Sequence, residues 1–326
     1  MKDLIILGNG MAGMTAALYA KRANLDFKIV GRDEYDFGQI GNAILVENYP
    51  CADKMTGFDL AMKLYDQLAE DGIEIEERNI TRVMKCFEPI KSLGYKPPYY
   101  LVEYDDGMFD YAKTVIYALG AKHKELPCPV EDGIPIHYCA LCDGTLYEGK
   151  TVAIIGGGDV AFTQAEYLSN ICKQVKIIMC DRNVTASPST VERVKKLSNI
   201  SIYYDFVISE IAMNKSLITD NNEEDRFIIS RQVPDDGRAR LLATSADAIF
   251  VAIGMAPNTK LLTDDFFNIV DKNGYLIADE DCACFMTPGF YAAGDVRKKA
   301  LRQSITAAAD GANAVNSAMK YLRENR

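Results

Sequence analysis

The sequence predicts an α/β protein of two Rossmann-like, three-layer domains, one of them inserted in the other. Residues 3–30 are expected to form a strand, a glycine-rich turn, a helix and a second strand, with the turn reading G-N-G-M-A-G. Residues 151–179 repeat this order, with the turn reading G-G-G-D-V-A. Both turns fit a dinucleotide-binding unit, in which small residues permit a tight turn, close approach of a pyrophosphate and helix packing.

Short apolar runs that end at glycine or at a polar turn define the other elements. We expect strands at residues 3–7, 26–30, 114–120, 151–155, 174–179, 248–254 and 289–295, and helices that end near residues 23, 169 and 321. The polar stretches 221–225 and 234–237 are typical of hairpin turns.

The position of the second glycine turn sets the domain boundaries. It lies wholly between the strands at 114–120 and 248–254. We therefore expect a discontinuous domain from residues 1–117 and 248–326, and an inserted domain from residues 118–247.

Composition excludes several classes of protein. A chain of 326 residues is long enough for two domains of about 150 residues each, and its 48% hydrophobic and 25% charged residues disfavour disorder. The net charge of −10 disfavours binding to nucleic acid or to an anionic membrane. No apolar run is as long as a spanning helix, and no cleavage site follows the apolar start, so we expect a cytoplasmic protein.

Nine cysteines, an odd number, do not suggest a disulfide framework, and Cys139 and Cys142 form the only Cys-x-x-Cys motif. The motif could be two buried thiols, half of a zinc site with Cys282 and Cys284, or a redox-active disulfide. The Cys-x-Cys spacing of Cys282 and Cys284 does not suit zinc, so no metal site is expected. Asp143 follows the motif and could move a proton during thiol–disulfide exchange, or serve as a turn or cap residue.

The order of motifs along the chain resembles the low-molecular-weight thioredoxin reductases over nearly its whole length. After the first glycine turn come V-E-N-Y-P, A-L-G-A, C-A-L-C-D-G, the second glycine turn, V-A-I-G-M-A-P-N-T, Y-A-A-G-D and R-Q-S-I-T. The resemblance implies a homodimer that reduces thioredoxin, with FAD in the discontinuous domain and the redox disulfide in the inserted, pyridine-nucleotide-type domain. It also implies that Cys139 is the attacking sulfur and that Cys142 lies near the flavin.

The resemblance implies a set of residues that contact FAD. They are Gly8, Gly10, Gly13, Asp33, Glu34, Gly38, Gln39, Asn48, Gly120, Gly294, Asp295, Arg302, Gln303 and Ser304. The first three form the phosphate turn, Asp33 or Glu34 would bind the ribose hydroxyls, and Asp295 would contact the ribitol chain. Alternatively, Asp33 is a solvated loop carboxylate, and Gln39 and Gln303 are helix-cap or interface residues.

One segment departs from the NADPH-dependent members, which carry H-R-R-x-x-x-R after the second strand of the inserted domain. Here Met179, Cys180, Asp181 and Thr185 occupy those four positions, and Asp181 would repel a 2′-phosphate. This pattern resembles the ferredoxin-dependent flavin thioredoxin reductases, which implies ferredoxin as the electron donor. An NADH- or NADPH-dependent reductase, a deazaflavin-linked relative and a non-catalytic flavin-binding sensor are the alternatives.

A ferredoxin donor would need a basic docking surface. Ferredoxins are typically acidic, and the net charge of −10 opposes their approach. Arg297, Lys298 and Lys299 are the candidates for such a surface, and a solvated loop is the alternative.

Overall fold

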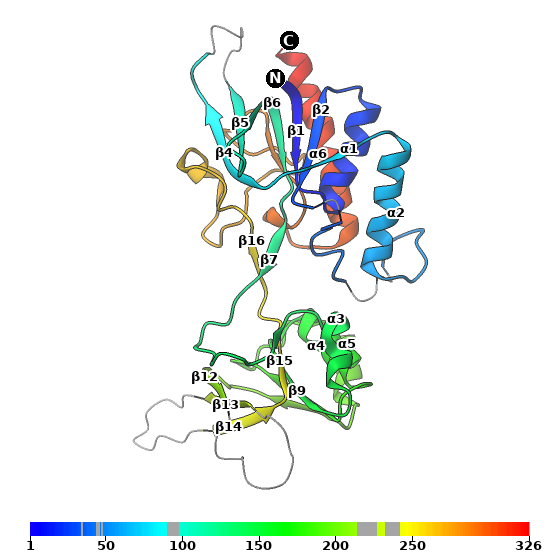
Figure 1. The fold of residues 1–326 in the computed structure, drawn as a ribbon, viewed down its shortest axis with the longest axis vertical. Coiled ribbons are helices and arrows are strands. Elements are labelled where there is room, and N and C mark those ends of the chain that lie inside the picture. Colours follow the sequence, from blue (N-terminus) through cyan, green and yellow to red (C-terminus); the bar gives the residue numbers. More distant parts are fainter. Residues whose placement is uncertain are drawn as a thin grey trace. The chain divides into compact units, whose positions relative to one another are not determined.

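The computed structural model describes residues 1–33, 35–43, 46, 48–89, 98–213, 227–231 and 242–325, and of these the side chains of 141–142, 227–231 and 242–243 lie outside the description. The chain forms two compact units, one of Met1–Lys122 with Ala256–Arg326, the other of His123–Met255 (Figure 1). The chain thus passes between units after Lys122 and Met255, several residues later than the expected 117 and 247. Strands β7 (Ala121–His123) and β16 (Met255–Pro257) pair at these crossings.

The first unit is built on a seven-stranded sheet. Six strands lie in the order β3-β2-β1-β6-β5-β4, and β17 also pairs with β6. Strands β1, β2, β3 and β17 run parallel to β6, whereas β4, β5 and β6 form an antiparallel meander. The bounds are β1 (Lys2–Leu7), β2 (Phe27–Gly31), β3 (Ile75–Glu77), β4 (Ile80–Cys86), β5 (Tyr99–Tyr104), β6 (Phe109–Tyr117) and β17 (Phe290–Ala292).

Buried side chains on both faces of β1 explain its position at the centre of this sheet. Leu4, Ile5, Ile6 and Leu7 have no exposed area, the pattern typical of a parallel strand covered on both sides. The helices of this unit are α1 (Met11–Arg22), α2 (Gly57–Glu70) and α6 (Ser304–Glu324).

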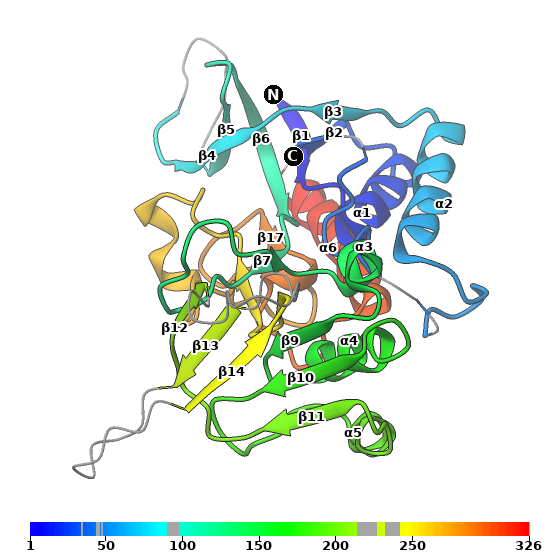
Figure 2. The same cartoon turned by 60° about the horizontal axis from the view of Figure 1, so that its bottom comes forward.

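Helices α1 and α6 lie side by side although they come from opposite ends of the chain (Figure 2). A Cβ atom on Gly311 of α6 would lie 2.2 Å from the backbone oxygen of Ala12 in α1, so glycine permits this close approach. The predicted C-terminal helix and the first predicted strand–turn–helix unit are therefore confirmed, and they share one core.

The second unit holds the inserted Rossmann-like layer. Its five parallel strands lie in the order β11-β10-β9-β15-β8, and a separate antiparallel sheet has the order β12-β13-β14. The bounds are β8 (Ile136–His137), β9 (Thr151–Ile155), β10 (Gln174–Ile178), β11 (Ile200–Tyr203), β12 (Ile208–Met213), β13 (Phe227–Arg231), β14 (Leu242–Ala246) and β15 (Ala248–Val251), with helices α3 (Ala140–Asp143), α4 (Asp159–Leu168) and α5 (Pro188–Lys195).

The predicted fold class is confirmed: both units are α/β, and each carries a glycine turn between a parallel strand and a helix. The hairpin turns expected at residues 221–225 and 234–237 lie outside the described residues. Within the described part of the chain, no helix has both the length and the apolar composition needed to cross a membrane.

Candidate functional site

The Cys-x-x-Cys motif lies in the second unit, between β8 and a short 3₁₀ helix, Gly144–Tyr147. Cys139 is disulfide-bonded. The seven cysteines outside the motif are all free thiols. The Cys142 side chain is outside the described part of the structure, so its pairing with Cys139 stays a prediction.

Asp143 contacts a histidine that lies two residues before the motif. Its Oδ2 atom is 3.0 Å from Nδ1 of His137, and Nε2 of His137 is 2.8 Å from the Tyr147 hydroxyl. Asp143 precedes the 3₁₀ helix but makes no side-chain hydrogen bond to cap it. Its carboxylate therefore belongs to a polar chain beside the motif, and the cap alternative is not observed. His137 is not among the site residues predicted from the sequence, although it is one of only two histidines in the chain.

The first glycine turn connects β1 to α1 and leaves the start of the helix open. Gly8 has a φ of +104°, and a Cβ atom on Gly13 would lie 1.7 Å from the Gly8 carbonyl oxygen. Gly10 is the N-cap of α1 and provides no side-chain hydrogen bond. The first N–H groups of a helix have no partner within the helix and suit an anionic pyrophosphate, so this turn fits a dinucleotide.

Four of the predicted cofactor segments meet at one edge of the sheet. Strands β1, β2, β6 and β17 are parallel and end in register, with Tyr117 opposite both Leu7 and Ala292. The segments with Gly8, Asp33, Gly120 and Gly294 therefore follow neighbouring carboxyl ends, where open α/β sheets bind ligands.

Of the two acidic residues predicted to bind the ribose after β2, the structure describes only Asp33. Asp33 is exposed, and its Oδ1 atom accepts a hydrogen bond from the Tyr35 backbone N–H at 2.8 Å. Its backbone oxygen accepts from the Asn9 side chain at 2.7 Å, which joins the glycine turn to the end of β2. Glu34 lies outside the described residues. One Asp33 oxygen is thus used in a local turn.

Two predicted residues that are far apart in the sequence contact each other. The Asn48 side-chain amide donates to the Gln303 side-chain oxygen at 2.9 Å. Gln303 is also the N-cap of α6, with a reciprocal bond to Thr306, and Ser304 begins the helix. The cap alternative for Gln303 is therefore observed, together with the contact to Asn48.

Gly38, Gln39 and Gly120 lie in loops of the first unit. The Gln39 amide donates to the backbone oxygen of Ala121 at 3.2 Å, next to Gly120. Gly38 and Gly120 have φ values of +65° and +62°, which favour glycine. These contacts fix Gln39 beside the backbone that leaves β6.

Asp295 carries a buried carboxylate oxygen. Among the described residues, its Oδ1 atom is buried and has no hydrogen bond, and burial raises the pKa of its carboxyl group. The Arg302 Nε atom is also buried without a partner, while its guanidinium lies 4.1 Å above the Tyr275 ring. A buried acceptor beside an open helix start fits a ligand that brings hydroxyl donors, as the ribitol chain of FAD would.

The prediction of an exposed basic docking surface is wrong for two of its three residues, because their side chains are nearly buried. Arg297 and Lys299 bind the buried Asp310 carboxylate at 2.6 and 2.8 Å, with side chains only 12% and 10% exposed. Lys298 alone is exposed. The sequence gives no local sign of this burial, because the partner Asp310 lies 11 to 13 residues further along the chain, on α6.

The two cysteines weighed as zinc ligands are buried thiols. Cys282 donates to the Asp310 backbone oxygen at 3.4 Å, and burial raises its pKa to about 12. Burial also raises the pKa of Cys284. Protonated thiols are poor metal ligands. No group of three or more potential metal ligands occurs among the residues that the structure describes.

The second glycine turn is joined to the segment after β10 by internal contacts. The Thr185 backbone N–H donates to the Gly157 carbonyl at 3.0 Å, and the Ser187 N–H donates to the Asp159 carboxylate at 2.7 Å. A Cβ atom on Gly157 would lie 2.4 Å from the Met179 methyl group. The Gly157 carbonyl and one Asp159 carboxylate oxygen thus accept hydrogen bonds within the protein.

The same segment carries little positive charge. Arg182 is the only cation between residues 179 and 187, and its Nε atom lies 2.6 Å from the Asp205 carboxylate. Asp181 accepts from the Asn183 backbone N–H at 2.7 Å, so it stabilises a local turn. The segment that the resemblance aligns with the 2′-phosphate arginines of NADPH-dependent members therefore holds one exposed arginine, paired with Asp205, and an acidic turn.

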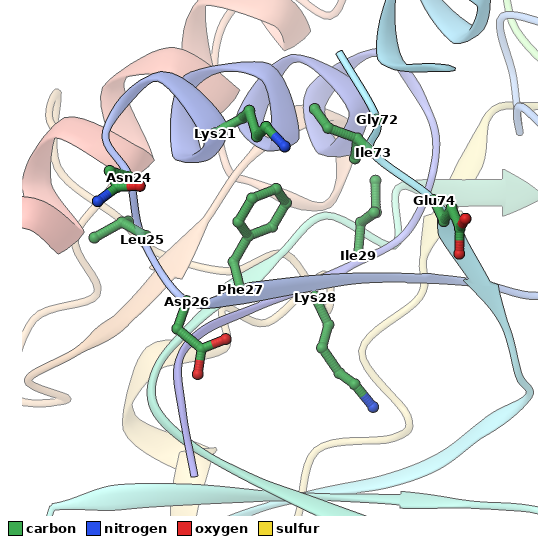
Figure 3. Close-up of a pocket in the computed structure, with 10 residues that line it drawn as sticks. All are labelled: Lys21, Asn24, Leu25, Asp26, Phe27, Lys28, Ile29, Gly72, Ile73 and Glu74. Carbon is green, nitrogen blue, oxygen red and sulfur yellow. The ribbon is translucent and has the colours of Figure 1, made fainter. Parts of the chain in front are cut away.

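A shallow cavity of about 330 Å³ lies near Lys21, Phe27 and Glu74 (Figure 3). It borders the start of β2, whereas the predicted cofactor segments follow the strand ends. None of the predicted site residues line it. The cavity therefore lies apart from the residues that are predicted to bind the cofactor.

The family profile described as "Pyridine nucleotide-disulphide oxidoreductase" matches residues 2–311. That range includes both glycine turns, the Cys-x-x-Cys motif and Asp295. The chain belongs to this family.

Within the pyridine nucleotide-disulphide oxidoreductases, the chain is similar to thioredoxin reductases. It is 32% identical over 316 residues to the thioredoxin reductase of Mycoplasma genitalium, with 96% of this chain and 93% of that protein covered. It is 35% identical over 323 residues to a 34.2 kDa protein in the rubredoxin operon of Clostridium pasteurianum, with 98% and 97% covered. The crystal structure of Lactococcus lactis thioredoxin reductase in the FR conformation has a TM-score of 0.84 at 28% identity, with 99% and 100% covered. The resemblance to thioredoxin reductases as flavoprotein disulfide oxidoreductases is confirmed.

Proposed function

We propose that this member of the thioredoxin reductases binds FAD, reduces thioredoxin through a Cys139–Cys142 disulfide, and takes its electrons from ferredoxin. One observation carries the redox assignment: Cys139 is disulfide-bonded, while all seven cysteines outside its motif are free thiols. Cys142 is then the sulfur available to pair with it. When bound, FAD supplies the two electrons that reduce this disulfide to two thiols.

The dithiol passes its electrons on by thiol–disulfide exchange. The Cys139 thiolate attacks a thioredoxin disulfide, forming a mixed disulfide and releasing one thioredoxin thiolate. The Cys142 thiolate then attacks Cys139, which restores the enzyme disulfide and releases the second thioredoxin sulfur. The two protons of the enzyme thiols end on the thioredoxin thiols, and Asp143 is the carboxylate placed to move one of them.

Residues of the first unit would hold FAD. The N-terminal turn of α1, with Gly8, Gly10 and Gly13, fits the pyrophosphate, and Asp295 offers a buried acceptor to the ribitol hydroxyls. Asn48 and Gln303, which contact each other, would lie beside the flavin according to the resemblance.

Asp295→Asn is expected to stabilise the apoprotein and to weaken FAD binding. The raised pKa means that ionised Asp295 costs folding free energy at neutral pH, a cost that disappears as the pH falls through that pKa. A lost charge-assisted hydrogen bond to FAD is worth about 1.5–3 kcal/mol, or about 10- to 100-fold in affinity. Thermal melting of apoprotein and FAD titration measure the two effects. A parallel loss of apoprotein stability and affinity would contradict this role.

The segment after β10 supports a donor other than NADPH. NADPH binding needs cations at the 2′-phosphate, and this segment offers one arginine, already paired with Asp205. Each charge-assisted bond to a phosphate contributes about 1.5–3 kcal/mol, so several missing bonds weaken NADPH binding by orders of magnitude. Ferredoxin needs no site for a 2′-phosphate, and its electrons would reach the disulfide only through FAD.

Reduced ferredoxin is expected to support thioredoxin reduction, whereas NADPH and NADH are not. The measurement is anaerobic, steady-state reduction of thioredoxin with each donor in turn, together with bleaching of the flavin absorbance. The matched gain-of-function variant is Cys180→Arg/Asp181→Arg, which restores two arginines of the NADPH pattern and should introduce flavin reduction by NADPH.

Two results would contradict the proposal at different points. Flavin bleaching of the natural protein by micromolar NADPH or NADH would replace ferredoxin by that nucleotide. A preparation with FAD that reduces no thioredoxin with any donor would favour the flavin-binding sensor.

A further inference from the structure

We propose that His137, held by Tyr147, is a positioning residue that orients the Asp143 carboxylate for proton exchange with the thiol pair. The inference rests on the proposed function, because it assigns a partner to the carboxylate beside the Cys139–Cys142 motif. All of its contacts lie within the second unit. It adds His137 and Tyr147 to a redox site that otherwise consists of the two cysteines and Asp143.

The geometry occupies both nitrogens of the imidazole. Nδ1 lies 3.0 Å from Asp143 Oδ2, and Nε2 lies 2.8 Å from the Tyr147 hydroxyl. The ring also stacks on Phe250, with centroids 5.2 Å apart, and Phe250 has no exposed area. A ring held on both edges and on one face keeps one orientation, which fixes the direction of the bond to Asp143.

The two hydrogen-bond partners of His137 indicate which of its ring nitrogens carries the proton. Burial and the nearby Asp143 charge raise the pKa of Tyr147, so its hydroxyl keeps its proton. If that hydroxyl donates to Nε2, a neutral histidine carries its own proton on Nδ1 and donates it to the Asp143 carboxylate. This arrangement satisfies the histidine and its two partners, and in the proposal the second oxygen of Asp143 exchanges the proton.

The position of the chain matches a need of the reaction. Thiol–disulfide exchange consumes two enzyme thiols and yields two thioredoxin thiols, so protons must leave and rejoin sulfur atoms as bonds change. Asp143 follows Cys142 directly in the sequence, and its backbone N–H donates to the Cys139 carbonyl at 3.2 Å. His137 holds the Oδ2 atom of that carboxylate. Within the described part of the structure, no other side chain is seen to bond the second Asp143 oxygen.

Few other groups compete for the imidazole. Among the described residues, the titratable groups that face His137 are Asp143, from α3, and Tyr147, from the 3₁₀ helix, while β15 faces it with the apolar ring of Phe250. The side chain of His137 is 16% exposed and that of Asp143 is 33% exposed. The partly exposed end of the chain is therefore the carboxylate.

The experiment follows the oxidation of the pre-reduced, full-length protein and bypasses the electron donor. The rate of thiol–disulfide exchange is measured across pH with oxidised thioredoxin and, separately, with a small aromatic disulfide. His137→Phe keeps an aromatic ring but removes both nitrogens, and His137→Gln keeps a hydrogen-bond donor. The matched control is His123→Phe, because His123 also stacks on an aromatic ring, that of Tyr138, whereas the described contacts of Asp143 do not include His123.

We expect His137→Phe to slow exchange by about tenfold or more, which is less than the about 100- to 10,000-fold that a positioned acid–base group itself contributes, because His137 acts only through Asp143. The pH dependence of the rate should also change, and His137→Gln should recover part of the loss. In an Asp143→Asn background, His137→Phe should have no further effect, because the histidine acts through that carboxylate. His123→Phe should leave the rate within about twofold.

Three results would overturn the inference. The first is an unchanged rate and pH profile in His137→Phe, and the second is an equal loss of rate when His137→Phe is added to Asp143→Asn. The third is a loss of rate in His137→Phe together with a melting temperature that is lowered in both His137→Phe and His137→Gln, which would indicate a structural role. If the natural protein exchanges with the small disulfide but not with thioredoxin, the proposed function fails. The rates of exchange with the small disulfide then still test the role of His137.

Discussion

Cys139→Ser and Cys142→Ser are each expected to reduce thioredoxin-dependent turnover to the background rate while FAD stays bound. A serine oxygen forms no disulfide, so neither variant holds the electron pair as a dithiol. The candidate FAD residues belong to Met1–Lys122 and Ala256–Arg326, whereas the motif lies in His123–Met255, so cofactor content should not change. The measurements are steady-state thioredoxin reduction and the FAD-to-protein absorbance ratio.

The control for these variants is Cys180→Ser, because Cys180 is an exposed free thiol of the same unit. It should retain full activity. Cys142→Ser should also trap thioredoxin as a mixed disulfide through Cys139, and Cys139→Ser should not. Trapping by Cys139→Ser alone would reverse the roles of the two sulfurs, and turnover in either serine variant would remove the redox disulfide from the mechanism.

Asp310→Ala is expected to give the largest loss of stability of any single charge removal in the first unit. Its carboxylate accepts from Arg297 at 2.6 Å, from Lys299 at 2.8 Å and from the Gly294 backbone N–H at 3.0 Å. Removing it leaves two nearly buried cations and a buried N–H without their partner, which costs about 3–5 kcal/mol. At about 2–4 °C per kcal/mol for a domain of this size, Tm should fall by about 6–20 °C.

The control for Asp310→Ala is Lys298→Ala, the exposed cation between the two buried ones. It should change the free energy of unfolding by no more than about 0.5 kcal/mol. A compensating variant, Asp310→Leu/Arg297→Met/Lys299→Met, replaces the whole ion cluster by apolar side chains and should recover much of the loss. Calorimetry or thermal melting of the holoprotein decides between these values. A change below about 1 kcal/mol in Asp310→Ala would show that water reaches the cluster.

Local patterns in the sequence were sufficient for much of the fold. The strands and helices beside Gly8 and Gly156 follow from apolar runs and small-residue turns, which act over a few residues and need no knowledge of the rest of the chain. The Cys-x-x-Cys motif was recognised for the same reason. The carboxyl-edge arrangement of the cofactor segments also follows once the strands are assigned as parallel.

Contacts made by tertiary packing were not predictable in this way. His137 meets Asp143 and Tyr147 only because β8 runs into α3 and the following 3₁₀ helix, and the sequence offered no signal beyond the rarity of histidine. Arg297 and Lys299 were read as surface charges because most lysines and arginines are exposed. Their partner Asp310 lies on α6, whose sequence is rich in small residues and does not indicate a buried carboxylate.

The packing of α6 against α1 has a consequence for how the protein is made. Gly311 touches Ala12, so the helix that covers the first glycine turn leaves the ribosome about 300 residues after that turn. At about 5–20 residues per second, the N-terminal strand and helix wait about 15 to 60 s for this partner. The unit of His123–Met255 is complete before then and is able to fold first. During synthesis, the apolar face of α1 is therefore a surface for chaperones, and truncations that remove α6 should be the first to aggregate.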